Sequence, residues 1–384
     1  MNTDVLDRVR RQLVDAGTPP RRSALAALVR QDTGGLAGHR QVLGLVHEAE
    51  SELAGAGPLQ HLLDQPGVTD VLVNGPDSVW VDCGGGLVRA DVRFTDEAAV
   101  RGLAQRLAAL AGRRLDDASP YVDAALPDGT RLHAVLPPVA PGGTCLSLRT
   151  FMARAFTIDD LEHAGTLRNG AALLLRAIVR SRAAFLVSGG TGSGKTTLLA
   201  SMLGLVQPAE RLILVEDAAE LRPTHPHVVR LTARPPNVEG AGEVSLRDLV
   251  RQALRMRPDR LVVGEVRGAE VVELLTALNT GHAGSGGTLH ANSAAQVPAR
   301  LEALGALGAL DRHAVCSQVA AALQIAIHLD RLREGSRVLT EIGVFQRERD
   351  EMVVVPAWRY DTGPVAGWDV LTEILGPHLV GSVR

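Results

Sequence analysis

The fold of this chain is decided by the stretch Ala184-Phe185-Leu186-Val187-Ser188-Gly189-Gly190-Thr191-Gly192-Ser193-Gly194-Lys195-Thr196-Thr197. An apolar run comes first, and a glycine-rich loop, a lysine and two threonines follow it. The loop fits the pattern G-x-x-x-x-G-K-[ST], in which backbone N–H groups surround phosphates, the lysine reaches the β and γ phosphates, and the Ser/Thr hydroxyl meets Mg²⁺. The sequence therefore predicts a phosphate-binding loop between a buried strand and a helix, whose dipole adds to the anion site.

Lys195 is the only lysine among the 40 lysine and arginine residues of the chain. A compact ammonium on a flexible stem fits between phosphate groups in a tight loop, whereas a planar guanidinium is bulkier and has a different donor geometry. The use of lysine at this one position supports a phosphate-binding role. The alternative is a glycine-rich turn that carries a lysine by chance.

Length and composition exclude several classes of protein. The 384 residues exceed one typical core, so two or three domains are expected. A net charge of −3 and only 3% aromatic residues argue against a protein that binds nucleic acid directly. The cysteines and histidines show no metal-ligand spacing, and no apolar run approaches the ~20 residues of a membrane span. We expect a cytoplasmic protein that contacts a membrane only through partners.

Three regions of the chain differ in their patterns. Residues 1–55 have apolar residues at helical spacing, which predicts a helical N-terminal segment. Residues 56–150 alternate short strand-like runs with turn residues around one helical stretch, which predicts a small α+β domain. Residues 151–384 alternate apolar strands with helices, which predicts an α/β domain with a C-terminal extension.

Polar residues follow three further apolar strands of the last region. Glu216 follows Leu212–Val215. Gly264 and Glu265 follow Leu261–Val263, and His290 follows a third run, Gly287–Leu289. Ligands bind at the carboxyl ends of the strands in open parallel sheets. These residues are therefore expected to lie near the phosphate loop.

Glu265 is the first candidate for the group that orients or deprotonates the attacking water. The common pattern ends the apolar strand in Asp-Glu, whereas here Gly264 replaces the aspartate. Phosphoryl transfer depends on positioning and on the metal, so Mg²⁺ is expected on Thr196, on waters and on Glu216. The alternative for both glutamates is a carboxylate in a surface loop.

His282 and His290 lie in a stretch rich in glycine, serine and threonine, residues 280–293. A single histidine in such a place is usually a packing or surface residue. Two histidines in one loop beside a sheet edge suggest a sensor of the γ phosphate.

Four stretches together resemble the Walker A, Asp box, Walker B and His box of the type II/IV secretion and pilus-assembly ATPases. They are residues 189–197, 214–221, 261–267 and 280–293. Within that superfamily, Arg234-Pro235-Pro236-Asn237-Val238-Glu239-Gly240 is similar to the Flp-pilus (CpaF-like) branch. The resemblance covers residues 58–345, and a glycine at the position of Gly264 is usual in it.

The resemblance implies a RecA-like P-loop ATPase domain that follows a smaller N-terminal domain, with ATP and Mg²⁺ as cofactors. It implies a homo-hexameric ring in which arginines outside the four motifs reach the phosphates, some of them from a neighbouring subunit. Arg131 and Arg149 match those positions best, and Arg267 is a further candidate; the alternative for each is a surface or interdomain salt bridge. It also implies a peripheral location at the inner face of the cytoplasmic membrane, where the motor acts on a platform protein.

Three functions are compatible with these patterns. The first is an ATP-hydrolysing motor of a pilus or a secretion machine. The second is a conjugation-associated or DNA-directed RecA-like ATPase, which the net charge of −3 disfavours. The third is a non-enzymatic nucleotide-binding scaffold, which the presence of Glu216, Glu265 and both histidines disfavours.

Overall fold

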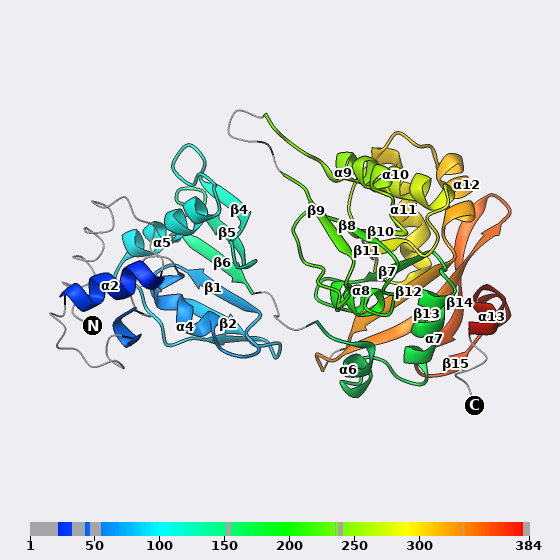
Figure 1. Ribbon diagram of the computed structural model, residues 1–384, viewed down its shortest axis with the longest axis horizontal. Helices are drawn as coiled ribbons and strands as arrows, with labels where there is room; N and C mark the ends of the chain where they lie inside the picture. The colour runs from blue at the N-terminus through cyan, green and yellow to red at the C-terminus, as the bar shows by residue number, and fades with distance from the viewer. Residues whose placement is uncertain are drawn as a thin grey trace. The chain divides into compact units, whose positions relative to one another are not determined.

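The computed structural model describes residues 22–32, 43–46, 55–150, 155–234, 236, 241–332 and 334–378. The chain divides into two compact units, Met1–Met152 and Ala153–Arg384 (Figure 1). Most of the helical segment predicted for residues 1–55 falls outside the described residues, so a separate N-terminal segment stays a prediction. Helix α2, Arg22–Asp32, lies within it, and the apolar residues Leu25 and Val29 on this helix are buried.

The first unit is built on a six-stranded sheet in the order β3-β2-β1-β6-β5-β4. Every neighbouring pair is antiparallel. The strands are β1 Asp70–Asn74, β2 Val79–Asp82, β3 Leu87–Arg89, β4 Tyr121–Ala125, β5 Arg131–Val135 and β6 Cys145–Arg149. Besides α2, the helices of this unit are η1 Gly57–Leu59, α4 Gln60–Leu63 and α5 Glu97–Leu110. The predicted small α+β fold is therefore present in this unit.

Helix α5 supplies one side of the core of the first unit. Asp96 caps the helix by accepting a hydrogen bond from the Ala99 N–H, which is a common way for a helix to begin. Val100, Leu103 and Leu107 follow at helical spacing and are buried in one cluster with apolar residues of the sheet. The helical spacing that the sequence showed is thus the face that packs on the strands.

The second unit is built on a nine-stranded sheet in the order β15-β14-β13-β12-β7-β11-β10-β8-β9. Its strands are β7 Phe185–Gly189, β8 Leu212–Glu216, β9 Val228–Thr232, β10 Arg260–Val266, β11 Gly286–His290, β12 Ile325–Arg331, β13 Arg337–Glu348, β14 Glu351–Arg359 and β15 Gly363–Pro364. The strands from β12 to β9 in this order are parallel, and β13, β14 and β15 join antiparallel.

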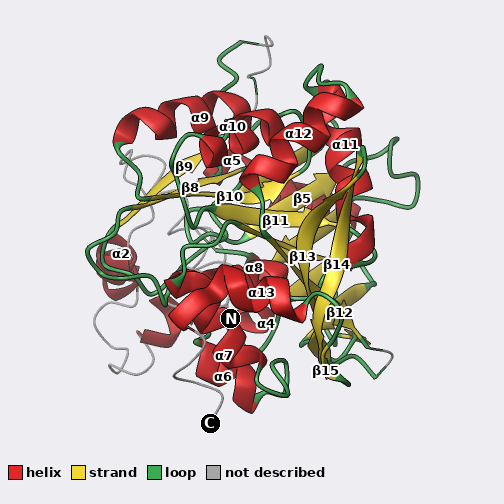
Figure 2. Ribbon diagram, turned by 90° about the vertical axis from the view of Figure 1, so that its right-hand side faces the viewer, coloured by secondary structure: helices red, strands yellow, loops and turns green. Residues whose placement is uncertain are grey.

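Helices cover both faces of this sheet. The described helices are α6 Ile158–His163, α7 Ala171–Arg180, α8 Lys195–Leu203, α9 Leu246–Ala253, η2 Leu254–Met256, α10 Glu270–Asn279, η3 Ala294–Gln296, α11 Val297–Leu307, α12 Arg312–Ala322, α13 Trp368–Leu375 and η4 Gly376–His378. Helices α6, α7, α8 and α13 pack on one face, and α9 to α12 pack on the other (Figure 2). Alternate residues of β7 enter the two cores, with Val187 on one face and Leu186 on the other. The unit is a RecA-like α/β fold.

The C-terminal extension completes the sheet and contributes to both of its cores, with Met352 and Val354 of β14 in the core under helices α9 to α12. Trp358 on β14 and Leu371 and Leu375 on α13 are buried in the same cluster as helices α6, α7 and α8. The sequence had given this part of the chain no assigned element. Its burial shows that it belongs to the α/β unit.

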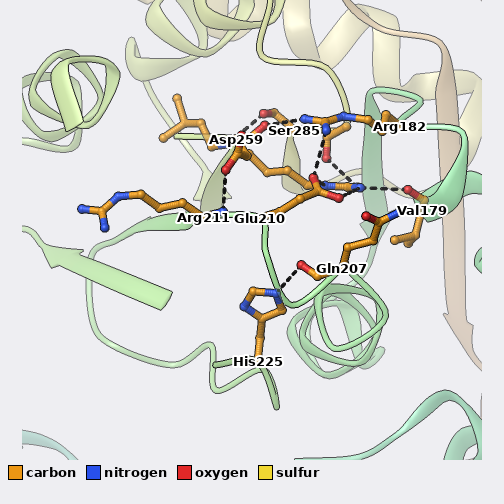
Figure 3. Close-up of polar contacts among 11 residues, drawn as sticks. Val179, Arg182, Gln207, Glu210, Arg211, His225, Asp259 and Ser285 are labelled. Atoms are coloured by element: carbon orange, nitrogen blue, oxygen red, sulfur yellow. Dashed lines mark hydrogen bonds and ion pairs between the residues drawn. The ribbon is translucent and has the colours of Figure 1, made fainter. Parts of the chain in front are cut away.

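A network of buried charges lies at the amino ends of the parallel strands, opposite the glycine-rich loop. Arg260, the first residue of β10, is only 2% exposed. Its Nε donates to Glu210 Oε2 at 2.9 Å, and its Nη2 donates to Glu210 Oε1 at 3.2 Å and to the Val179 carbonyl at 3.0 Å. Arg182 approaches the same carboxylate, with its Nη1 3.2 Å from Glu210 Oε2 (Figure 3). Because each charge has partners, the network can remain buried.

Candidate functional site

The glycine-rich loop begins where β7 ends beside β12. Gly189 has a φ of 152°, and a Cβ atom on it would lie 2.4 Å from the Leu329 carbonyl oxygen and 2.6 Å from Ser193 Oγ. No side chain fits at this position. Gly192 and Gly194 have φ values of 72° and 98°, a region that glycine enters without strain. The backbone therefore requires glycine at three positions of the loop, and α8 begins directly after it.

Lys195 lies folded against its own loop. Its side chain is 7% exposed, and its Nζ donates to the Gly189 carbonyl at 3.1 Å and to the Gly190 carbonyl at 2.8 Å. The same nitrogen is 3.4 Å from His290 Nδ1. Burial lowers the pKa of Lys195, and the negative charge of Glu265 opposes this effect. A buried ammonium is stabilised by a negative charge beside it, and an anion bound in the loop would supply that charge.

Glu265, His290 and Arg267 form a contact chain that ends at Lys195. Glu265 Oε1 lies 2.6 Å from His290 Nε2, and its other oxygen accepts a hydrogen bond from Arg267 Nη2. Burial and the charge of Lys195 lower the pKa of His290, so its imidazole is neutral at pH 7. A neutral imidazole with its hydrogen on Nε2 leaves Nδ1 to accept from Lys195 and turns its N–H side toward Glu265 Oε1, which makes no hydrogen bond within the described residues. The structure thus joins four of the residues that the sequence singled out.

Glu216 is the most buried carboxylate at this edge of the sheet, with 3% exposed. Its Oε1 accepts hydrogen bonds from the N–H groups of Glu220 at 3.0 Å and Leu221 at 2.8 Å. Its Oε2 is buried and has no hydrogen-bond partner among the described residues. Burial raises the pKa of Glu216 to about 7. The second oxygen therefore remains available to a ligand.

Gly264 makes room for Glu216. A Cβ atom at Gly264 would lie 2.7 Å from Glu216 Cγ, closer than a side chain allows. An aspartate at this position, as in the common Asp-Glu pattern, would displace the buried carboxylate. The replacement that the sequence showed therefore has a physical reason, since the two acidic positions compete for one space.

The donor set fits Mg²⁺ bound together with a phosphate. No group of three or more His, Cys, Asp or Glu side chains that could hold a metal ion occurs within residues 55–378 as far as they are described. Mg²⁺ does not need such a group, because it takes one or two protein oxygens and completes its shell with waters and substrate phosphates. Thr196 at the start of α8 and the free Oε2 of Glu216 match that requirement. Three strand spacings, about 14 Å, separate β8 from β7, so Glu216 would act on the ion through ordered waters rather than bind it directly.

His282 has a different environment from His290. Its Nδ1 lies 3.0 Å from the Ala277 carbonyl, so it can donate to the last turn of α10. None of the contacts found in the described part of the chain joins His282 to Lys195 or Glu265. Its role as a sensor of the γ phosphate stays a prediction.

Arg131 and Arg149 lie in the first unit at strand ends, where the sequence placed them. Arg131 begins β5, Arg149 ends β6, and the two are directly opposite in register. Arg149 Nε also contacts Asp70 Oδ1 at 3.0 Å, and Asp70 is its register partner on β1. The salt bridge that the sequence left open as an alternative is therefore present for Arg149, and a phosphate contact of either arginine stays a prediction.

Two residues near the loop escaped the sequence reasoning. Arg337 Nε donates to the Gly192 carbonyl at 2.9 Å, and His328 Nδ1 lies 2.9 Å from Ser188 Oγ. Both lie on the β12–β13 hairpin, far from the loop in sequence. Nothing marked Arg337 in a chain whose cations are almost all arginine. A single histidine in the apolar strand Ile325–Leu329 was a visible but weak signal.

Comparison with known proteins identifies the family. The family model described as Type II/IV secretion system protein matches residues 52–349. The chain belongs to this family. A Mycobacterium tuberculosis protein whose name assigns it to conjugal transfer is 59% identical over 332 residues, which are 85% of this chain and 94% of that protein. The conjugal transfer protein TrbB of Rhizobium radiobacter is 30% identical over 283 residues, 72% of this chain and 83% of that protein.

Solved structures of this secretion family support the fold. The pilus retraction motor PilT with bound ADP has a TM-score of 0.55 and 23% identity, and the match covers 82% of this chain and 85% of that one. The Yersinia pseudotuberculosis ATPase DotB has a TM-score of 0.51 and 17% identity, with 82% and 79% covered. No described helix is long and apolar enough to cross a membrane.

Proposed function

We propose that the chain is an ATP-hydrolysing motor of a secretion or pilus machine. The observation that carries this proposal is the contact chain from Lys195 through His290 to Glu265 at the mouth of the glycine-rich loop. It puts a cation for phosphate, a neutral imidazole and a carboxylate at the carboxyl ends of neighbouring parallel strands. Ligands bind at this edge in sheets of this type.

The residues divide the work of phosphoryl transfer. The loop N–H groups and Lys195 bind the phosphates, and Thr196, together with Glu216 acting through waters, would hold Mg²⁺, whose charge would offset the charge on the phosphate oxygens. Glu265 orients the water or takes its proton, since a carboxylate is the usual group for this step. His290 positions Glu265, because its ring lies between the carboxylate, 2.6 Å from Nε2, and the Lys195 ammonium, 3.4 Å from Nδ1.

We further propose a homo-hexameric ring at the cytoplasmic side of the inner membrane, coupled to a membrane platform protein. The sequence similarity to the Flp-pilus branch and the names of the relatives in type IV secretion and conjugal transfer support this assignment. In such a ring Arg131 and Arg149 would reach the phosphates of their own or a neighbouring subunit, and Arg267 would leave Glu265 to do the same. Membrane contact would come through the partner.

A second candidate is a conjugation-associated motor that acts on DNA. The name of the M. tuberculosis relative favours a conjugation system, while the net charge of −3 disfavours direct binding to DNA. DNA-stimulated ATP hydrolysis together with a salt-dependent affinity for DNA would favour this second candidate. Pull-down of a membrane platform protein, with no effect of DNA, would favour the first.

The test of the activity uses the purified full chain. Lys195→Ala and Glu265→Ala are each expected to lower ATP turnover at least about 100-fold, since each removes a group that acts on the transferred phosphate or the water. Glu351→Ala is the matched control, because this carboxylate is 63% exposed and, among the described residues, pairs with Arg312 alone at the surface. Normal turnover in both site variants would remove the assigned site, and ATP binding without hydrolysis in the wild type would indicate a scaffold.

A further inference from the structure

Arg337 lies against the glycine-rich loop. Its Nε donates to the Gly192 carbonyl at 2.9 Å, and its Cδ is 3.4 Å from the position that a Cβ on Gly194 would take. Arg337 is the first residue of β13, more than a hundred residues after the loop. The hairpin from β12 to β13 therefore carries a cation to the place where the proposed function puts phosphates.

The hairpin and the loop belong to one packed body. β12 pairs with β7 in parallel, with His328 opposite Ser188 and Leu329 opposite Gly189. The Ser188 hydroxyl contacts His328 Nδ1 at 2.9 Å in the buried layer, and the Leu329 carbonyl lies where a side chain on Gly189 would be. These contacts fix the hairpin to the base of the loop. Arg337 is thus held beside the loop of its own subunit.

Most of the guanidinium of Arg337 is still available. Only Nε is used, and neither Nη1 nor Nη2 makes a hydrogen bond to any residue in the part of the chain that the structure describes. By contrast, Arg260 uses Nε, Nη1 and Nη2 in bonds to Glu210 and to carbonyl groups. A guanidinium with its terminal nitrogens exposed matches the fork geometry of phosphate oxygens.

The position of Arg337 also separates it from the residues proposed for hydrolysis. β12 is the neighbour of β7 on one side, whereas β11 and β10, which carry His290 and Glu265, lie on the other. A phosphate chain in the loop would therefore have the water-activating groups on one flank and Arg337 on the opposite flank. The backbone N–H groups of such a loop surround the phosphates that ADP and ATP share, so Arg337 beside Gly192 would face that part of the nucleotide.

We propose that Arg337 binds the diphosphate part of a nucleotide held in the loop of the same subunit. This inference rests on the proposed function, since it takes the loop as a nucleotide site. The Nε bond holds the Gly192 carbonyl, and the two terminal nitrogens donate to phosphate oxygens. Arg337 then binds the nucleotide held by its own chain. It lies in the same unit as the loop, Ala153–Arg384, whereas Arg131 and Arg149 lie in the first unit, Met1–Met152.

The experiment compares nucleotide affinity in three variants of the full chain, with ADP and a non-hydrolysable ATP analogue as probes. Arg337→Ala removes both the loop contact and the charge. Arg337→Gln keeps a donor, because Nε2 of glutamine is as many bonds from Cα as Nε of arginine, and removes the charge. Arg347→Ala is the control, since this arginine is on the same strand and pairs with Asp350 at the surface.

We expect Arg337→Ala and Arg337→Gln each to lower the affinity for ADP and for the ATP analogue about 10- to 100-fold. This is the usual effect of losing one hydrogen bond to a charged group. Arg347→Ala should bind like the wild type. Wild-type affinity in Arg337→Gln would show that only the loop contact matters and would overturn the proposal. A loss confined to the ATP analogue would also overturn it. Failure of the wild type to bind either probe would instead reject the proposed function.

Discussion

The two ends of the sheet in the second unit differ in whether their buried polar and charged atoms have hydrogen-bond partners. At the amino end, both oxygens of Glu210 and all three guanidinium nitrogens of Arg260 have partners. At the carboxyl end, Glu216 Oε2 and Ser193 Oγ are buried without a hydrogen bond to any described residue. Within the described part of the chain, the partners of Lys195 at that end are carbonyl groups of its own loop and the ring of His290.

The difference separates what holds the fold from what receives a ligand. A buried polar atom without a partner costs about 1–3 kcal/mol, so such atoms are rare in native proteins. When several gather at one edge of a sheet, a ligand that satisfies them is the simplest explanation. Changes at the amino end should therefore affect stability alone, while changes at the carboxyl end should affect ligand binding and can even increase stability.

The largest effect on stability is expected from Glu210→Ala. This change leaves Arg260 buried with no carboxylate, which should lower the free energy of unfolding by about 3–5 kcal/mol. ATP turnover per folded molecule should not change, because the network is at the opposite end of the sheet from Lys195. Urea denaturation and turnover at a temperature where the variant is folded would measure the two effects.

Arg359→Ala provides the matched control for that prediction. Arg359 pairs with Glu341 at 2.9 Å, and its side chain is 48% exposed, so its loss should cost about 0–1 kcal/mol. Equal effects of the two changes would mean that burial of the Glu210 network contributes nothing. A drop in ATP turnover of the folded Glu210→Ala variant would show that the amino end of the sheet affects activity as well as stability.

Glu216→Gln should raise the free energy of unfolding, whereas Glu210→Ala lowers it. Burial raises the pKa of Glu216 to about 7, so its carboxylate binds a proton more tightly in the folded chain than in the unfolded one. Its contribution to stability is present at low pH and is lost as the pH rises toward and through 7. The ionised form above pH 7 destabilises the ligand-free protein by up to about 3 kcal/mol. Glutamine keeps an oxygen for the N–H groups of Glu220 and Leu221.

The difference between wild type and Glu216→Gln is therefore expected to depend on pH. At pH 8 without nucleotide the variant should be more stable, at pH 4 the two should be equal, and ATP turnover should be lower in the variant. Thermal melts across this range would measure the effect. A variant that is less stable than the wild type at pH 8 would contradict the assignment of Glu216 to a ligand.

The smallest effect is expected from His282→Ala. Loss of the hydrogen bond to the Ala277 carbonyl should lower the free energy of unfolding by about 1 kcal/mol. We expect turnover to fall less than in His290→Ala, because His290 contacts both Lys195 and Glu265. An equal fall in turnover in the two variants would mean that His282 acts in the site together with His290. The site would then include residues that follow α10.

The sequence predicted the fold well where local patterns and the sheet agree. Apolar runs that end in polar residues predicted the strands β7, β8, β10 and β11, and parallel pairing then brought Glu216, Glu265 and His290 to one edge. The sequence showed that Gly264 replaces an aspartate but not why. The cause is the side chain of Glu216 on the neighbouring strand β8, and no local pattern reveals that contact. Most strand bounds lie within two residues of the expected runs, as is usual for strand ends, but β10 continues three residues past Val263, and Val266 still pairs with Leu289 of β11.

Contacts between distant segments could not be predicted. Arg337 and His328 reach the loop only because β12 is the neighbour of β7, and strand order is not readable from apolar periodicity. The same holds for the Arg260–Glu210 pair, whose residues are 50 positions apart. In a chain with one lysine and many arginines, residue type alone does not distinguish an arginine at a site from one on the surface.

The central claim is that Lys195 binds the phosphates of ATP in a loop that only a lysine side chain fits. ATP turnover of Lys195→Arg tests it most directly, because arginine is the cation that the chain uses everywhere else. We expect turnover to fall at least about 100-fold while the charge is kept, since the larger planar group cannot take the same position among the loop carbonyls and phosphates. Turnover close to that of the wild type in a well-folded Lys195→Arg variant would contradict the account.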